Sequence, residues 1–131
     1  MKIAEISQNA DWKTEKHVPV IEAPDVVKAG DKVVVQVSVG KEIAHPNTTE
    51  HHIRWIKLFF KPDGGKFAYD LGTFEFAAHG ESAEGPNKGP AFTEPFASAA
   101  VKLSVSGTLL ASAYCNIHGL WEDSKAIRVE G

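Results

Sequence analysis

The chain has 131 residues, of which 43% are hydrophobic and 24% are charged, a composition typical of one globular domain, which we expect to cover residues 1–131. Its 14 basic and 17 acidic residues give a net charge of −3 without a dense run of Lys and Arg, so we expect no nucleic-acid partner. No apolar stretch approaches the roughly 20 residues that span a bilayer, and the first residues lack a secretory leader pattern, so we expect a cytoplasmic protein with no membrane partner.

The first half of the chain contains three expected strands. Before them, residues 9–13 are compatible with a single helical turn. The clearest strand is KVVVQVSVG, residues 32–40, in which every second residue from Val33 to Val39 is a valine, the period of two that predicts a half-buried strand. Residues 52–60 (HIRWIKLFF) and 66–76 (KFAYDLGTFEF) are rich in β-branched and aromatic residues, and the KPDGG between them predicts a turn.

The second half of the chain continues this pattern after a loop. Residues 77–90 (AAHGESAEGPNKGP) are rich in Gly and Pro and poor in apolar residues, which predicts a surface loop. Strands are then expected at 96–105 and 108–115, on either side of a short turn, and at 125–130. About seven short strands with almost no helical periodicity predict an all-β fold, a seven-stranded immunoglobulin-like antiparallel β-sandwich, with a closed barrel as the alternative.

Six histidines and one cysteine are the residues best suited to bind a metal. They are His17, His45, His51, His52, His79, His118 and Cys115. Cys115 ends a predicted strand, His118 follows three residues later, and Gly119 permits the chain to turn, so both side chains can face one centre. This spacing is a weak metal motif on its own, because a buried thiol beside an incidental histidine also fits it.

The segment HPNTTEH would hold His45 and His51 about 20 Å apart if the chain were extended. Ligands of one ion lie within a few ångströms of each other, so this segment has to fold back, and Pro46 and the polar residues after it favour such a turn. In a strand, His52 would point to the opposite face from His51, so we interpret it as structural or exposed. His79 lies in the Gly-rich loop with no partner at ligand spacing, and we expect it to be exposed to solvent.

Four imidazoles and one thiolate, if they converge, favour iron over other metals. Structural zinc closes at four ligands, and catalytic zinc has three protein ligands and an open position. A blue-copper site uses two His, one Cys and usually a weak axial Met, whereas the only methionine here is Met1. A five-coordinate site with a free sixth position suits redox-active iron better. A copper electron carrier and an immunoglobulin-like binding module with a structural metal are the alternatives to an iron enzyme.

Three sequence blocks, taken together, resemble one family. EKHVP (15–19), HPNTTEHHIRWI (45–56) and CNIHGLW (115–121) are similar, in the same order, to the signature blocks of the superoxide reductases, in particular the one-iron class also called neelaredoxins. The resemblance covers essentially the whole chain. It implies an immunoglobulin-like β-sandwich with one iron ion, cycling between Fe²⁺ and Fe³⁺. It also implies that one electron and two protons convert superoxide to hydrogen peroxide, without forming oxygen, in defence against oxidative stress.

The resemblance further implies a role for each residue of the site. The iron ligands would be His17, His45, His51 and His118 in the equatorial plane and the Cys115 thiolate on the axis. Glu15 would be the carboxylate that occupies the sixth position of the oxidised iron and leaves on reduction. Lys16 would be the cation that attracts superoxide to the open site, although an isolated Glu-Lys pair is otherwise a pair of solvated surface charges. Backbone N–H groups of residues 116–118 are expected to hydrogen-bond the sulfur.

The expected partners also follow from the resemblance. It implies an external electron donor similar to rubredoxin, because the four-cysteine iron domain of the two-iron desulfoferrodoxins is absent from these residues. It implies a homo-oligomer, either a dimer or a tetramer. The substrate is a small anion, and a chain of negative net charge attracts such an anion only through a local positive site, which a metal or one placed lysine supplies.

Overall fold

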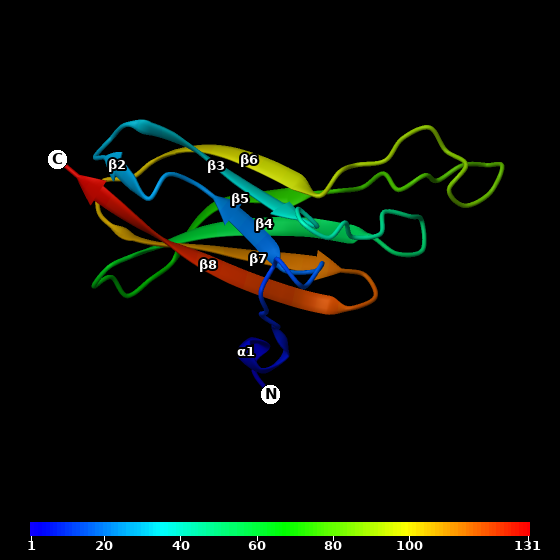
Figure 1. Ribbon diagram of the computed structural model, residues 1–131, viewed down its shortest axis with the longest axis horizontal. Helices are drawn as coiled ribbons and strands as arrows, with labels where there is room; N and C mark the ends of the chain where they lie inside the picture. Colours follow the sequence, from blue (N-terminus) through cyan, green and yellow to red (C-terminus); the bar gives the residue numbers. More distant parts are fainter.

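Two sheets and one short helix make up the computed structural model, which describes residues 1–131 (Figure 1). The elements are α1 (Ile3–Ile6), β1 (Pro19–Glu22), β2 (Val26–Lys28), β3 (Lys32–Val39), β4 (Ile53–Pro62), β5 (Tyr69–Glu75), β6 (Phe96–Lys102), β7 (Gly107–Cys115) and β8 (Gly119–Glu130). The smaller sheet has the strand order β1-β3-β6, and the larger sheet has the order β2-β8-β7-β4-β5. The prediction of an all-β fold is confirmed, with two separate sheets rather than one closed barrel.

Two details of the predicted sandwich are wrong. There are eight strands rather than seven, because β1 and β2 are too short to give a recognisable period of two. The pairing is also not antiparallel throughout, since β2 runs parallel to β8, with Val26 opposite Arg128. The N–H of Arg128 donates to the carbonyl oxygen of Asp25 at 2.9 Å and supports this pairing. A three-residue strand that covers one edge of β8 has too few side chains to show a pattern in the sequence.

The core lies between the two sheets and consists of the alternating residues that the sequence predicts. In β3, every second residue from Val33 to Val39 is buried. In β7, every second residue from Gly107 to Cys115 is buried, and Ile56 and Leu58 of β4 are fully buried against them. Burial of each large apolar side chain contributes roughly 1.5–3 kcal/mol, so these strands form a rigid frame. Cys115 is the last buried position of β7, which places its thiol at the end of the core.

The only helix, α1, lies outside the two sheets (Figure 1). The predicted helical turn at residues 9–13 is wrong. The carbonyl oxygen of Asp11 accepts a bond from the N–H of Thr14 at 3.0 Å, and its carboxylate accepts one from the N–H of Lys13 at 3.0 Å. Local bonds of this kind from an Asp side chain form a turn in place of a helix. No helix of the structure has the length and apolar character needed to cross a membrane.

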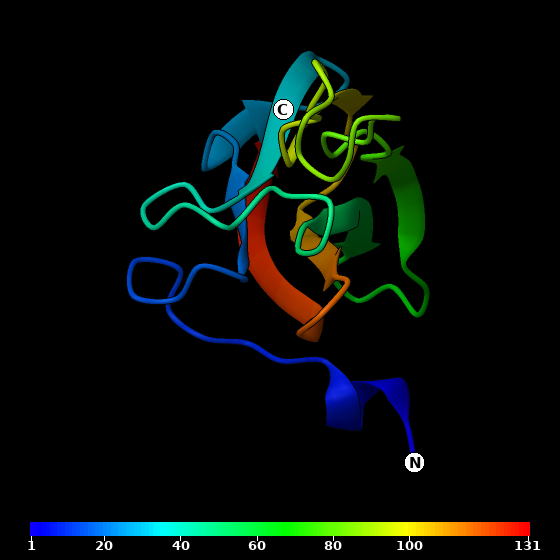
Figure 2. The same cartoon turned by 90° about the vertical axis from the view of Figure 1, so that its right-hand side faces the viewer.

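Three loops meet at one end of the sandwich. One precedes β1, the second joins β3 to β4, and the third joins β7 to β8; Figure 2 looks onto this end and shows them in blue, cyan-green and orange. The three signature blocks of the sequence fall on these loops and on the strand residues next to them. The predicted loop of residues 77–90, between β5 and β6, projects from the same end (Figure 1).

Candidate metal centre

The predicted donor residues lie together at this end of the sandwich. One donor atom from each of His17, His45, His51 and Cys115 lies within 4.8 Å of the other three. The Nδ1 atom of His118 lies 3.2 Å from His17 Nε2, 3.2 Å from His51 Nε2 and 3.8 Å from Cys115 Sγ. The structure therefore brings together Cys115 and four of the five histidines of the signature blocks, all but His52, and we call these five residues the donor cluster.

The turn after β7 positions Cys115 and His118. Cys115 is fully buried and pairs with Gly119 at the start of β8. Gly119 has a φ of +82°, in the left-handed region that glycine adopts at little cost, which confirms that the chain turns here. The N–H of His118 donates to Cys115 Sγ at 3.3 Å, as expected for a backbone group that follows the cysteine.

The loop that carries His45 and His51 folds back as its sequence predicts. The N–H of Thr48 donates to the carbonyl oxygen of His51 at 2.9 Å, and the N–H of His51 donates to Thr48 Oγ1 at 3.0 Å. Before this loop, Gly40 has a φ of +87°, and a Cβ atom there would lie 2.6 Å from the backbone nitrogen of His45. Only glycine allows this close approach, so Gly40 fixes the path of the chain into His45.

Asn116, between Cys115 and His118, joins the β7–β8 turn to the histidine loop. Its Oδ1 accepts a bond from the N–H of His52 at 2.9 Å, and its Nδ2 donates to the carbonyl oxygen of Glu50 at 2.8 Å. Its backbone N–H donates to the carbonyl oxygen of His52 at 3.1 Å. Sequence reasoning missed this role, because an Asn in a turn is common for local reasons and these partners are distant in the sequence.

His45 offers a donor atom that no other group in the protein uses. Its Nδ1 lies 2.6 Å from the carbonyl oxygen of Pro46 and donates to it, whereas Nε2 is buried without a hydrogen-bond partner. Burial lowers the pKa of His45 to about 4, an effect that the bond to Pro46 opposes and the charge of Lys16 reinforces. The imidazole is therefore neutral at neutral pH, with the lone pair of Nε2 free for a ligand, as metal binding requires.

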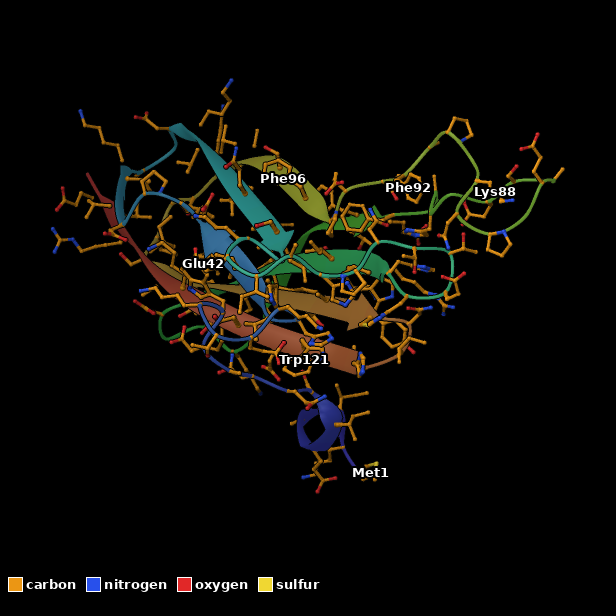
Figure 3. All side chains as sticks on the ribbon, turned by 45° about the vertical axis from the view of Figure 1, so that its right-hand side comes forward. Met1, Glu42, Lys88, Phe92, Phe96 and Trp121 are labelled. Carbon is orange, nitrogen blue, oxygen red and sulfur yellow. The ribbon has the colours of Figure 1, made fainter.

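The donor set as a whole fits a metal centre. Four imidazoles and one thiolate exceed the four ligands of a structural zinc site. A blue-copper site would need an axial Met, and Met1 is fully exposed at the chain end next to α1 (Figure 3). The residues therefore suit a single metal ion with a soft thiolate ligand and more than four protein ligands.

Glu15 holds one side of His17. Its Oε1 accepts a bond from the backbone N–H of His17 at 2.5 Å and lies 2.6 Å from His17 Nδ1. Burial raises the pKa of Glu15, but these bonds to His17 outweigh burial and hold the pKa below its ordinary value. The carboxylate is therefore ionised, and it fixes the ring so that Nε2 faces the donor cluster.

Lys16 is half-buried beside His17. Burial lowers the pKa of both His45 and His51, and the positive charge of Lys16 lowers them further, so Lys16 lies close to the donor cluster. It forms no ion pair and no side-chain hydrogen bond in the structure, although its charge also helps to lower the pKa of the neighbouring Glu15 carboxyl. An unpaired cation beside the donor cluster favours the approach of an anion.

The expectation that His79 is exposed is wrong, because its loop folds back on itself. The N–H of Gly80 donates to the carbonyl oxygen of Ala91 at 2.9 Å, and this closes the loop over His79, which is only 3% exposed. The His79 ring stacks on His52, with centroids 3.5 Å apart, and its Nε2 donates to the carbonyl oxygen of Phe76 at 2.6 Å. His52 is buried too, so of the two alternatives for this residue, structural or exposed, the structure favours the structural one.

The buried Nε2 of His45 predicts an acid-sensitive metal-free protein. A histidine titrates near 6.5 in the unfolded chain and His45 near 4 in the fold, so the unfolded state binds more protons between these values. The free energy of unfolding should therefore fall as the pH drops from 6.5 toward 4, by up to about 1.4 kcal/mol per pH unit from this residue. Urea denaturation of the metal-free protein at several pH values measures this slope. His45→Gln should give a shallower slope, and an unchanged slope would show that His45 does not titrate in this way.

Comparison with known proteins finds a family model, relatives and a solved structure that are similar to this chain. The Desulfoferrodoxin family model matches residues 9–124. The chain is 58% identical over 130 residues to neelaredoxin of Megalodesulfovibrio gigas, covering 99% of this chain and 100% of the relative. It is 55% identical over 121 residues to superoxide reductase of Pyrococcus furiosus, covering 92% and 95%. The solved structure of superoxide reductase (neelaredoxin) from Archaeoglobus fulgidus in the reduced form is similar with a TM-score of 0.88 at 56% identity, covering 94% of this chain and 98% of that one.

Proposed function

The chain belongs to the desulfoferrodoxin family and is a superoxide reductase of its one-iron class, and we propose that a single iron ion held by the donor cluster serves its reaction. The observation that carries this proposal is the convergence of four imidazoles and one thiolate on one point, with His45 Nε2 buried and otherwise unpartnered. The ligand atoms would be His17 Nε2, His45 Nε2, His51 Nε2, His118 Nδ1 and Cys115 Sγ. This mixed set of more than four donors suits redox-active iron.

Superoxide is the substrate and hydrogen peroxide is the product. The superoxide anion takes up one electron and two protons, and no oxygen is released, which distinguishes the reaction from dismutation. When bound, the iron supplies the electron as it passes from Fe²⁺ to Fe³⁺. The chain's own residues hold the ligand atoms together, attract the anion and keep the sulfur ionised.

Cys115 is proposed as the thiolate that would hold the iron together with the four imidazoles. A thiol bound to a metal is deprotonated, and Cys115 is fully buried, so its negative charge needs a partner inside the protein. The N–H of His118 donates to the sulfur at 3.3 Å and supplies that partner. A hydrogen bond to a thiolate reduces the charge it donates, so the β7–β8 turn both holds the sulfur and adjusts its donor strength.

Glu15 and Lys16 are proposed to serve the open side of the centre. The unpaired charge of Lys16 attracts the superoxide anion and orders the water that supplies a proton. Glu15 is proposed as a carboxylate that would also hold the oxidised iron, as the family resemblance implies. In the present arrangement its carboxylate instead fixes His17 through Nδ1, at 2.6 Å. Both roles are compatible with one carboxylate on the loop before β1, because that loop is held mainly by local turn bonds.

The architecture and the partners complete the proposal. One core includes residues from Val27 to Ile127, which supports a single domain over residues 1–131 with an immunoglobulin-like arrangement of its two sheets. We propose a rubredoxin-like donor for the electron, because the one cysteine of the chain is committed to the donor cluster. A homo-oligomer, either a dimer or a tetramer, is proposed on the family resemblance. A cytoplasmic location is proposed on the single cysteine, which cannot form an internal disulfide.

Metal analysis and product analysis together test the function. We expect one iron per chain, an absorption band from charge transfer between thiolate and iron in the oxidised protein, and consumption of superoxide without release of oxygen. Metal content is measured on the purified protein by mass spectrometry, and oxygen by an electrode during reaction with superoxide. Full occupancy by copper or zinc, or release of oxygen in the ratio of dismutation, would contradict the proposal.

A further inference from the structure

Trp121, near the start of β8, contacts two residues of the donor cluster with one side chain. Its ring stacks on the imidazole of His17, with centroids 4.9 Å apart and planes inclined by 15°. Its indole N–H donates to the carbonyl oxygen of His118 at 3.2 Å. We propose that Trp121 is a positioning residue, which holds His17 and His118 in the arrangement that metal binding needs; this rests on the metal centre of the proposed function.

Trp121 is itself held from two sides. Within the larger sheet it lies opposite Ala113 of β7. On the other edge of β8, the N–H of Glu122 donates to the carbonyl oxygen of Gln8 at 2.8 Å, and the N–H of Gln8 donates to that of Leu120 at 3.0 Å. Figure 3 shows Trp121 on the side of the molecule from which α1 projects. The backbone that carries the indole is therefore fixed by β7 and by the N-terminal segment, without any help from a metal.

The hydrogen bond from Trp121 matters most for the position of His118. It is exposed and lies in the turn after β7, and ordering an exposed side chain in a turn costs conformational entropy. Its carbonyl oxygen accepts from Trp121 Nε1 and also from Gln8 Nε2 at 3.4 Å. Two donors on one carbonyl fix the peptide that follows His118, and with it the backbone from which the imidazole extends.

His17, which lies just before β1 and far from Trp121 in the sequence, is restrained as well. Glu15 Oε1 lies 2.6 Å from His17 Nδ1, and the indole of Trp121 covers one face of the ring. Only Nε2 is left to face the donor cluster, 3.2 Å from His118 Nδ1. Trp121 thus restrains two ligands that lie 101 residues apart in the sequence.

Core packing alone does not account for Trp121. The main hydrophobic core consists of 17 buried residues, and Trp121, although buried, is not one of them. Its ring instead lies against a polar imidazole, and its N–H faces a carbonyl group of a ligand residue. A side chain that only filled space would serve as well without the indole nitrogen.

Iron binding to the full chain, with Trp121 replaced, tests the proposal. Trp121→Phe keeps a ring over His17 and removes the N–H donor, whereas Trp121→Leu removes both. Fe²⁺ is titrated anaerobically into the metal-free proteins against a competing chelator, and the thiolate-to-iron band is recorded after oxidation. We expect iron binding to weaken by about 10- to 100-fold in Trp121→Leu, with a shifted band, and to weaken less in Trp121→Phe.

Trp55→Leu is the matched control. Trp55 lies in β4, stacks on Tyr114 with centroids 5.7 Å apart, and makes no ring contact or hydrogen bond with the donor cluster, so its loss should leave iron affinity and the band unchanged. Unchanged affinity and band in both Trp121 variants would overturn the proposal, even if their thermal stability falls as in the control. If Trp121→Leu does not fold, Trp121→Phe against the wild type decides. A wild-type protein that binds no iron would overturn the proposed function together with this inference.

Discussion

Cys115→Ser is expected to abolish superoxide reduction and to remove the thiolate-to-iron absorption band. A serine hydroxyl keeps its proton and is a hard donor, so it cannot supply the charge of the buried thiolate. Loss of a hydrogen-bonding partner of a ligand already costs about 10- to 100-fold in metal affinity or activity, so loss of the ligand itself should cost more than about 100-fold. Stopped-flow kinetics with superoxide and absorption spectroscopy of the oxidised protein measure the two effects.

Ala111→Ser separates the loss of the ligand from the burial of a hydroxyl. Ala111 lies on the same buried face of β7, four residues before Cys115, and is 2% exposed. An unpartnered hydroxyl there should lower the free energy of unfolding by about 1–3 kcal/mol, yet leave the band and the rate near those of the wild type. Retention of the band in Cys115→Ser would show that Cys115 is not a ligand, and loss of the band in Ala111→Ser would show that general destabilisation explains both variants.

The strands that could be predicted are those in which apolar and polar residues alternate, because this alternation identifies the buried face. In β3 the valines from Val33 to Val39 alternate with polar or exposed residues, and the buried face follows directly. The three residues of β2 have no such pattern, and their parallel pairing with β8 depends on backbone bonds to a segment about 100 residues away. Its position is therefore fixed by tertiary contacts, which override local preference.

The metal centre also depends partly on residues that are close in the sequence and partly on contacts between distant segments. Cys115 and His118 lie in one turn, and His45 and His51 in one loop, so their spacing with turn residues and glycine indicates that each pair can converge. The convergence of the two pairs on His17 has no local signal, and the family resemblance supplied it. The sequence therefore predicts which atoms can serve as ligands more readily than it predicts what holds them.

The supporting residues were missed for this reason. Asn116 bonds to His52 and Glu50, and Trp121 stacks on His17, in each case across at least half of the chain's strands. His79 is buried because its loop closes on itself, although the loop has the composition of an exposed segment. A polar composition describes the surface of a loop as a whole, whereas a single ring within it can be covered by backbone that folds over it.

Lys16→Ala is expected to slow the reaction with superoxide by about tenfold while leaving the absorption band nearly unchanged, because the lysine attracts the anion without binding the metal. Lys16 is half-buried, forms no ion pair, and its charge acts on both His45 and His51. In the wild type the rate constant should fall as ionic strength rises, since salt screens this attraction, and the variant should show a weaker dependence. Pulse radiolysis or stopped-flow mixing at several salt concentrations measures both.

Lys13→Ala is the control that separates the position of the charge from its amount. Lys13 precedes the same strand, is exposed, and lies over the ring of Trp12 at 5.7 Å rather than beside the donor cluster. Either substitution changes the net charge from −3 to −4, so a general field effect would slow both variants equally. We expect Lys13→Ala to stay within about twofold of the wild type, and Lys16→Arg to recover most of the rate, because Arg keeps the charge at the same place. Equal slowing in Lys13→Ala and Lys16→Ala would remove the local role of Lys16, since net charge alone would then set the encounter rate.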